Sequence, residues 1–174
     1  QLTVGYKKIE QDEQDTIEDA ARLLAQALAA KGQVYIHGFK EMEGIVAQAI
    51  NGPEPLKGMK KLYSGQYMVQ AEQRDRAIIF ARSATEKEAV ALAESLRGQH
   101  VPFVAVSQGV TAEEEGKPNL AEIADVHIDI KATRGLVPNE DGTRSGLPTL
   151  AAALFAYQGI ILAVDEILRE YEEE

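Results

Sequence analysis

Apolar positions follow two different spacings along this chain. Across residues 15–30 they recur every three to four residues, with acids in the first turn and a Lys-Gly pair at the end, which predicts a helix. The run QVYIHGF at residues 33–39 is short, apolar and contains a glycine near its end, as a buried strand does. A second helical pattern over residues 41–50 completes a unit of strand, glycine turn and helix.

The same order resumes after residue 75. Strands are predicted at RAIIFA, VPFVAVS and VHIDI, with helices at residues 85–98 and 119–124 between them. Residues 51–74 hold three glycines and two prolines, and we expect a loop there with at most one short element. Because strands alternate with helices, the pattern favours a parallel sheet covered by helices on both faces.

The final helix is predicted over residues 148–171. Its first half is apolar nearly all round and its last turns are acidic. Such a helix needs burial on several sides, which a small domain can provide only in part. We therefore expect this helix to contribute to a homodimer contact.

Composition narrows the function classes. The 174 residues, 45% of them apolar, suit one compact domain spanning residues 1–174. A net charge of -10, and a single dense basic cluster at Lys57, Lys60 and Lys61, disfavour binding to nucleic acid. The absence of cysteine excludes disulfides, thiol catalysis and thiolate metal sites, and a cytoplasmic location is expected. The longest apolar run, residues 159–164, is too short to cross a membrane, so no membrane partner is expected.

Ligands of open parallel sheets bind beyond the carboxyl ends of the strands. Four segments lie there in this chain: residues 37–43, 82–86, 107–111 and 131–145.

Two interpretations of residues 82–86 stay open. Arg82, Ser83 and Thr85 stand at a predicted helix start, where free N–H groups, hydroxyls and a guanidinium suit a phosphate. Alternatively, Ser83 with Glu86, or Thr85 with Glu88, fits a capping box that only satisfies the first helical turn.

The stretch DRAIIFARSATEKEAVALAESLRGQHVPFVAVS, followed by NLAEIADVHIDI, resembles the sugar isomerase (SIS) domain. It is also similar to a bacterial branch of SIS-like proteins that is distantly related to phosphoheptose isomerases. The resemblance implies a flavodoxin-like three-layer αβα sandwich around a five-stranded parallel sheet. It further implies a dimer that binds a phosphorylated sugar. No cofactor is expected.

The chain departs from the SIS pattern at both loops. Where the family has Ser-x-Ser-Gly-x-Thr, residues 81–86 keep only Ser83 in register, with Thr85 one position away and the carboxylate of Glu86 at the last position. A carboxylate there would repel a phosphate unless it points outward. In the first loop Gly38 matches a family glycine, but Phe39, Lys40 and Glu41 replace small residues.

The resemblance implies a catalytic Glu on the helix after the first loop, with a Gln and a His on the last helix. Glu41 or Glu43 would be the first, and Gln158 the second, but Glu166 stands where the His belongs. The family's acid-base pair is therefore not reproduced, and no metal site is expected. His37, at the end of a strand on the ligand side, is a further candidate.

His100 and His127 are expected at the surface, and Ser145 or Thr149 could cap the last helix. We expect a phosphosugar-binding SIS protein with possible isomerase activity. The alternatives are a non-catalytic regulatory or scaffold module that dimerises through the last helix, and a protein without a small ligand. The ligand contacts predicted are Gly38, Phe39, Lys40, Arg82, Ser83, Thr85, Glu86, Ser107, Arg144 and Ser145.

Overall fold

A computed structural model describes residues 2–173 and contains a five-stranded parallel sheet. The strand order is β2-β1-β5-β6-β7, which in chain order is the 2-1-3-4-5 arrangement of flavodoxin-like folds. The strands are β1 (Val34–Gly38), β2 (Met59–Lys61), β5 (Arg76–Ser83), β6 (Phe103–Gln108) and β7 (Val126–Asp129).

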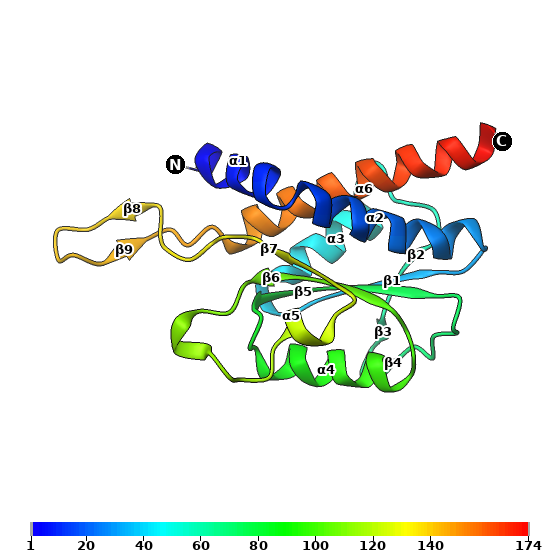
Figure 1. Cartoon of the computed structure of the whole chain (residues 1–174), viewed down its shortest axis with the longest axis horizontal. Helices are drawn as coiled ribbons and strands as arrows, with labels where there is room; N and C mark the ends of the chain where they lie inside the picture. The colour runs from blue at the N-terminus through cyan, green and yellow to red at the C-terminus, as the bar shows by residue number, and fades with distance from the viewer. Residues whose placement is uncertain (1, 174) are drawn as a thin grey trace.

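Helices cover both faces of this sheet (Figure 1). One face carries α1 (Leu2–Asp12), α2 (Gln14–Ala29), α3 (Glu43–Asn51) and α6 (Thr149–Glu173). The other face carries α4 (Lys87–Gly98), α5 (Leu120–Ile123) and the hairpin of β3 (Tyr63–Ser64) and β4 (Tyr67–Met68). The predicted three-layer αβα sandwich is confirmed.

The central strand β5 is buried on both faces of the sheet, which explains its unbroken run of apolar residues. Ile78 and Phe80 point into the core beneath α2 and α6, whereas Ala77, Ile79 and Ala81 point into the core beneath α4. All five side chains are fully buried. A strand covered on both faces has no solvent side, so the alternation of polar and apolar residues is lost.

Two parts of the fold differ from the prediction. Residues 2–12 form α1, which buries only Ile9 and therefore lacks a helical stripe of apolar residues. The segment expected to be mostly loop contains the edge strand β2 and the β3–β4 hairpin. In β2 only Met59 is buried, while its two lysines are exposed, so no apolar run marks this strand.

Short elements complete the loops. Two 3-10 turns occur, η1 (Lys40–Met42) before α3 and η2 (Ala112–Glu114) after β6. A hairpin of β8 (Val137–Pro138) and β9 (Arg144–Ser145) precedes α6. This hairpin extends away from the rest of the molecule (Figure 1).

Helix α6 combines an apolar composition with a length of 25 residues. By length and composition alone it could cross a membrane. Ala153, Ala156 and Ile160 are fully buried in the core that α6 shares with α2 and the sheet, as in the central helix of a globular domain. Leu154 and Leu162, however, are 38% and 62% exposed. One stripe of α6, in which exposed Gln158 lies between these two leucines, is thus left uncovered.

Candidate functional site

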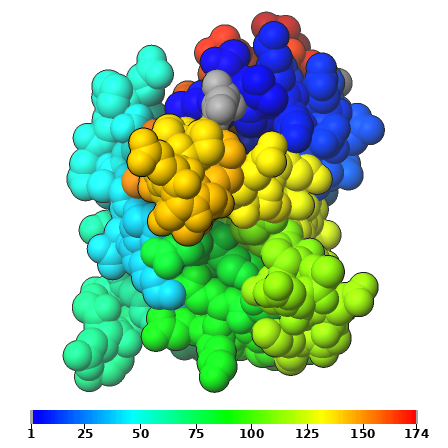
Figure 2. Space-filling model, turned by 90° about the vertical axis from the view of Figure 1, so that its left-hand side faces the viewer, coloured from blue at the N-terminus to red at the C-terminus, as the bar shows by residue number. Residues whose placement is uncertain are grey.

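Three of the four predicted loops meet at the carboxyl end of the sheet. Figure 2 looks onto this end: the green segment after β5 lies between the cyan segment after β1 and the yellow-green segment after β6. The fourth loop, coloured yellow and orange, lies above them. Polar contacts tie the first three loops to one another, and these contacts define the candidate site.

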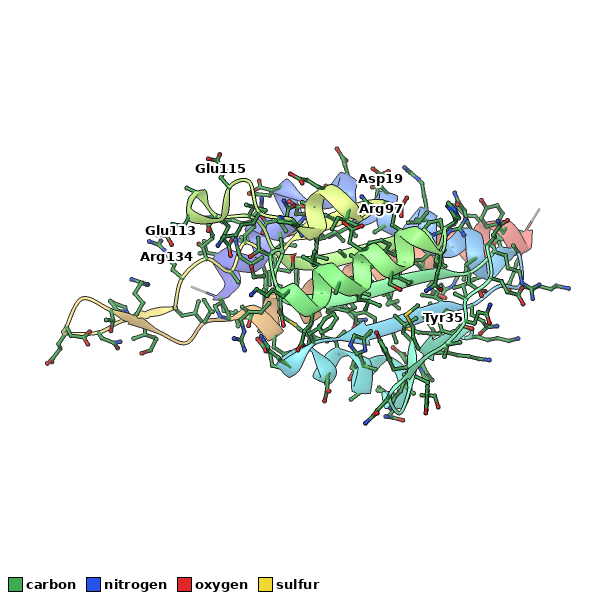
Figure 3. All side chains as sticks on the ribbon, turned by 90° about the horizontal axis from the view of Figure 1, so that it is seen from below. Asp19, Tyr35, Arg97, Glu113, Glu115 and Arg134 are labelled. Atoms are coloured by element: carbon green, nitrogen blue, oxygen red, sulfur yellow. The ribbon has the colours of Figure 1, made fainter. Side chains whose placement is uncertain are left out.

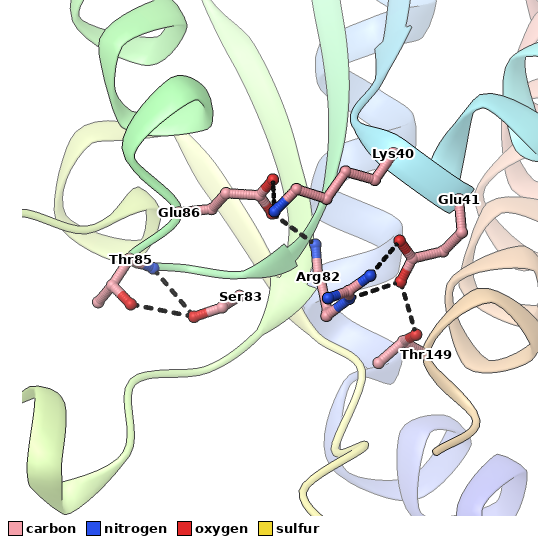
Figure 4. Close-up of polar contacts among 7 residues, drawn as sticks. All are labelled: Lys40, Glu41, Arg82, Ser83, Thr85, Glu86 and Thr149. Atoms are coloured by element: carbon pink, nitrogen blue, oxygen red, sulfur yellow. Dashed lines mark hydrogen bonds and ion pairs between the residues drawn. The ribbon is translucent and has the colours of Figure 1, made fainter. Parts of the chain in front are cut away.

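Arg82 and Glu41 form a bidentate ion pair (Figure 4). The Nε and Nη2 atoms of Arg82 each donate to one carboxylate oxygen of Glu41 over 2.8 Å. The hydroxyl of Thr149, at the start of α6, donates to Oε1 of the same carboxylate over 3.0 Å. Mainly through the Arg82 hydrogen bonds, the pKa of Glu41 is lowered to about 2. Glu41 therefore joins β5 to α6 as a permanent carboxylate and is a poor proton acceptor near neutral pH.

We expect acid to remove the stabilising contribution of this pair. Because the pKa of Glu41 is lowered in the folded chain, the contribution is complete above pH 4.5 and is lost as the pH falls toward 2. Glu41→Gln should lower the free energy of unfolding by about 1 kcal/mol at pH 7, a small effect because half of Arg82 is exposed to screening solvent. The loss should be smaller at pH 3, where part of the contribution of Glu41 is already gone. Urea unfolding at pH 7 and pH 3 measures the difference. Glu94→Gln, in an exposed helical pair with Arg97, is the control, and an equal loss there would contradict the expectation.

Lys40 and Glu86 form the second ion pair, with 3.0 Å between Nζ and Oε1. The other oxygen of Glu86 accepts the backbone N–H of Arg82 over 3.2 Å. The Glu86 side chain is only 9% exposed, so its carboxylate points into the site rather than outward. It occupies a position that combines a backbone N–H donor with an ammonium group.

Ser83 and Thr85 direct their hydroxyls at a third carboxylate, that of Glu114 in η2. Thr85 Oγ1 donates to Glu114 Oε1 over 2.6 Å, and Ser83 Oγ donates to the same oxygen over 3.3 Å. Oε2 accepts the backbone N–H and the hydroxyl of Thr111. Chiefly because of the Thr85 hydrogen bond, the pKa of Glu114 falls to about 2. The two hydroxyls thus converge on an anionic oxygen.

Glu114 was not among the predicted site residues. The sequence does carry one signal for its position, because Thr111 and Glu114 have the spacing of a capping box and form one at η2. The contact with Ser83 and Thr85 had no such signal, since it joins residues about 30 positions apart that only the sheet brings together.

The predicted capping of α4 is wrong. Helix α4 begins at Lys87, and its N-cap, Glu86, makes no side-chain capping hydrogen bond. The reason is that β5 continues to Ser83 and the N–H of Ala84 bonds to the carbonyl of Gln108, which delays the start of the helix. The hydroxyls of Ser83 and Thr85, whose oxygens lie 3.0 Å apart, are directed at Glu114 instead.

A pocket of about 630 Å³ opens beside these ion pairs, between the end of β1, α4 and the β3–β4 hairpin. His37 forms one wall, with ring centroids 4.6 Å from Phe39 and 4.7 Å from Tyr63. Burial lowers the pKa of His37, opposed by the charge of Glu43, so the imidazole is neutral at pH 7. The lining residues are His37, Gly38, Phe39, Lys40, Glu43, Tyr63, Gly65, Gln66, Glu88, Ala91, Leu92 and Ser95.

Two of the three catalytic candidates line this pocket. His37 and Glu43 both line it, whereas Glu41 lies outside it in its ion pair with Arg82. An imidazole and a carboxylate facing one pocket can in principle exchange a proton with a bound molecule. No three His, Asp or Glu side chains within residues 2–173 form a metal-binding cluster.

The remaining predicted contacts lie elsewhere. Ser107 is fully buried and lies 2.8 Å from Nε2 of His127, which is itself half-buried, not on the surface as expected. Arg144 donates to the carbonyls of Gly135 and Leu136 within the β8–β9 hairpin. Ser145 bonds to Asn139 in the same hairpin and is not a cap of α6. Ser107 thus belongs to the third loop but bonds to His127, and these bonds of Arg144 and Ser145 stay within the hairpin, away from the contacts that join the three loops.

Comparisons with known proteins place the chain in a family and a fold. Residues 1–168 match the family model described as a domain of unknown function, DUF2529. The uncharacterised protein YwjG of Bacillus subtilis (strain 168) is 34% identical over 171 residues, which cover 98% of this chain and 95% of that protein.

Two solved structures show the same fold at low sequence identity. The hypothetical protein MJ1247 of Methanococcus jannaschii, for which a 3-hexulose-6-phosphate isomerase function was inferred, aligns with a TM-score of 0.63 and 11% identity. The alignment covers 98% of this chain and 88% of the MJ1247 chain. The NanR protein of Vibrio vulnificus, complexed with ManNAc-6P, aligns with a TM-score of 0.51, 14% identity and coverage of 98% and 62%. The chain belongs to the DUF2529 family and has the fold of the sugar isomerase (SIS) domains.

Proposed function

We propose that this protein binds a phosphorylated sugar or sugar derivative at the carboxyl end of its sheet. One observation carries the proposal: the Ser83 and Thr85 hydroxyls already converge on an anionic oxygen. Beside them, the Lys40 ammonium and the Arg82 N–H each contact one of the two oxygens of the Glu86 carboxylate. Donors arranged around carboxylate oxygens suit the oxygens of a phosphate as well. The names of the two fold neighbours, which refer to sugar phosphates, support this ligand class.

In the proposed complex the sugar occupies the pocket next to Lys40. The rings of His37, Phe39 and Tyr63 offer apolar faces to its C–H groups, and Glu43 accepts hydrogen bonds from its hydroxyls. Lys40 lines the pocket and also reaches Glu86, so it links the sugar position to the phosphate position.

Two roles follow from such binding. As a sugar-phosphate isomerase, the protein would use neutral His37 and Glu43 as its acid-base pair. As a regulatory module, it would bind the ligand without turnover. The resemblance to phosphoheptose isomerases favours the first role, whereas the missing histidine on the last helix favours the second.

Calorimetric titration with a panel of hexose and heptose phosphates tests the ligand class. We expect binding of at least one phosphorylated sugar, and binding about tenfold weaker for Lys40→Ala, equivalent to about 1.4 kcal/mol. The unphosphorylated sugar and the exposed Lys57→Ala variant serve as controls. Equal affinity for the phosphorylated and unphosphorylated sugars would contradict the proposal. Isomerisation followed by NMR in D2O, and its loss in His37→Ala, would separate the enzyme from the regulator.

We also propose a cytoplasmic homodimer that buries the exposed stripe of α6. Leu154 and Leu162 lie on this stripe, with the half-buried Phe155 and Ile161 beside them. A two-fold axis across α6 would place this stripe against the same stripe of the partner subunit, with residue i facing residue j and residue j facing residue i, so one stripe is sufficient for both subunits. The acidic residues at the end of α6 would stay in solvent.

A further inference from the structure

Three consecutive acidic residues, Glu113, Glu114 and Glu115, occupy the loop after β6, and they differ in direction. Glu113 and Glu115 are exposed on the outside of this loop (Figure 3). Glu114 turns inward, and its two oxygens accept hydrogen bonds from Ser83, Thr85 and Thr111. One carboxylate therefore uses the hydroxyls that the proposed phosphate would need.

We propose that Glu114 is a built-in competitor of the ligand: its carboxylate closes the hydroxyl site in the free protein, and the phosphate must displace it to bind. This inference rests on the proposed function, and it adds how that site is regulated. A phosphate and the Glu114 carboxylate cannot share the two hydroxyls, because each hydroxyl has one proton to donate and the two anions repel each other. Binding and loop opening are thus coupled.

The loop around Glu114 is built as a segment with two fixed ends. At one end Gly109 donates its N–H to Asp129, in a space where a Cβ would lie 2.5 Å from that carboxylate. At the other end Asn119 is buried and caps α5 through the N–H of Glu122. Between these ends most side chains are exposed, and the apolar core clusters include none of residues 110–118. This segment can therefore move outward without exposing the core.

Under this competition the apparent affinity for phosphate equals the intrinsic affinity multiplied by the fraction of molecules whose loop is open. The closed loop is held by charge-assisted hydrogen bonds from Thr85 and Ser83 to the Glu114 carboxylate. Removing the charge of Glu114 weakens these bonds and removes the repulsion of the incoming phosphate. A variant without the Glu114 charge should therefore bind phosphate more tightly than the natural chain does.

Calorimetric titration with inorganic phosphate tests this inference on the whole chain. Glu114→Gln keeps the side-chain shape and an acceptor for Thr111 but removes the charge, and we expect it to bind phosphate about tenfold more tightly. Glu113→Gln and Glu115→Gln lose the same charge from the outside of the loop and should bind as the natural chain does. An unchanged or weaker affinity of Glu114→Gln would overturn the inference.

A second variant protects the test against a folding defect in the first. Thr111→Ala loosens the hold on Glu114 without touching Ser83 or Thr85, and it too should tighten phosphate binding. If the natural chain binds a sugar phosphate but neither variant binds more tightly, only the role of Glu114 fails. If neither the natural chain nor any variant binds inorganic phosphate or a sugar phosphate, the proposed function fails and the inference fails with it.

Discussion

Replacing Gly38 by alanine is expected to lower the free energy of unfolding by about 2–4 kcal/mol, through overpacking against rigid backbone. A Cβ at this position would lie 2.3 Å from the carbonyl oxygen of Met42 and 2.5 Å from its carbonyl carbon. These atoms belong to η1, which also carries Lys40 and Glu41. The substitution should therefore displace both ion pairs of the site as well as destabilise the fold.

Thermal unfolding and ligand titration measure the two effects of Gly38→Ala. For a chain of this size the loss corresponds to a melting temperature lower by roughly 5–15 °C. Gly44→Ala is the matched control: it lies in α3, its Cβ would be 3.6 Å from Leu150 in ordinary contact, and alanine favours a helix. Equal melting temperatures for the two variants would show that the β1 loop does not require a glycine.

Replacing Leu162 by glutamate is expected to weaken the proposed homodimer strongly. Leu162 is 62% exposed on α6, so the charge is tolerated in the monomer but would be desolvated against the partner subunit in the dimer. We expect the dissociation constant to rise at least about 100-fold, equivalent to 2.7 kcal/mol. Sedimentation equilibrium distinguishes a 19.0 kDa chain from twice that mass.

Tyr67→Glu is the matched control for this experiment. Tyr67 is 81% exposed on β4, on the opposite face of the sheet from α6, and receives the same charge. It should leave the association unchanged. A natural chain that sediments as a monomer at all concentrations would contradict the dimer, and a Leu162→Glu variant that still dimerises would place the contact on another surface.

Prediction of the fold succeeded where burial imposes a regular spacing. Helix α2 and the strand β5 carry strong patterns because one is apolar on a single face and the other is buried on both. The elements that were missed bury too little to show a pattern. Ile9 is the one buried residue of α1, and Met59 is the one buried residue of β2. Their places were decided by long-range packing that leaves no local trace.

Chain order predicted which loops lie together, whereas the contacts between them could not be predicted. The order of strands and helices places residues 37–43 and 82–86 at one end of the sheet, and the structure brings them together there. The choice between a helix cap and an anion site for Ser83 and Thr85 could not be made from their spacing. It depends on Glu114, which reaches them from another loop.

The layered architecture, the end of the sheet where the candidate loops meet, and most of the polar groups present there could be predicted from the sequence. This was possible because periodicity and chain order record burial and strand direction. Which groups pair depends on the three-dimensional fold: Arg82 pairs with Glu41, Lys40 with Glu86, and the hydroxyls of Ser83 and Thr85 with Glu114. The physical reason is that an ion pair or hydrogen bond depends on distances of about 3 Å between residues far apart in the chain.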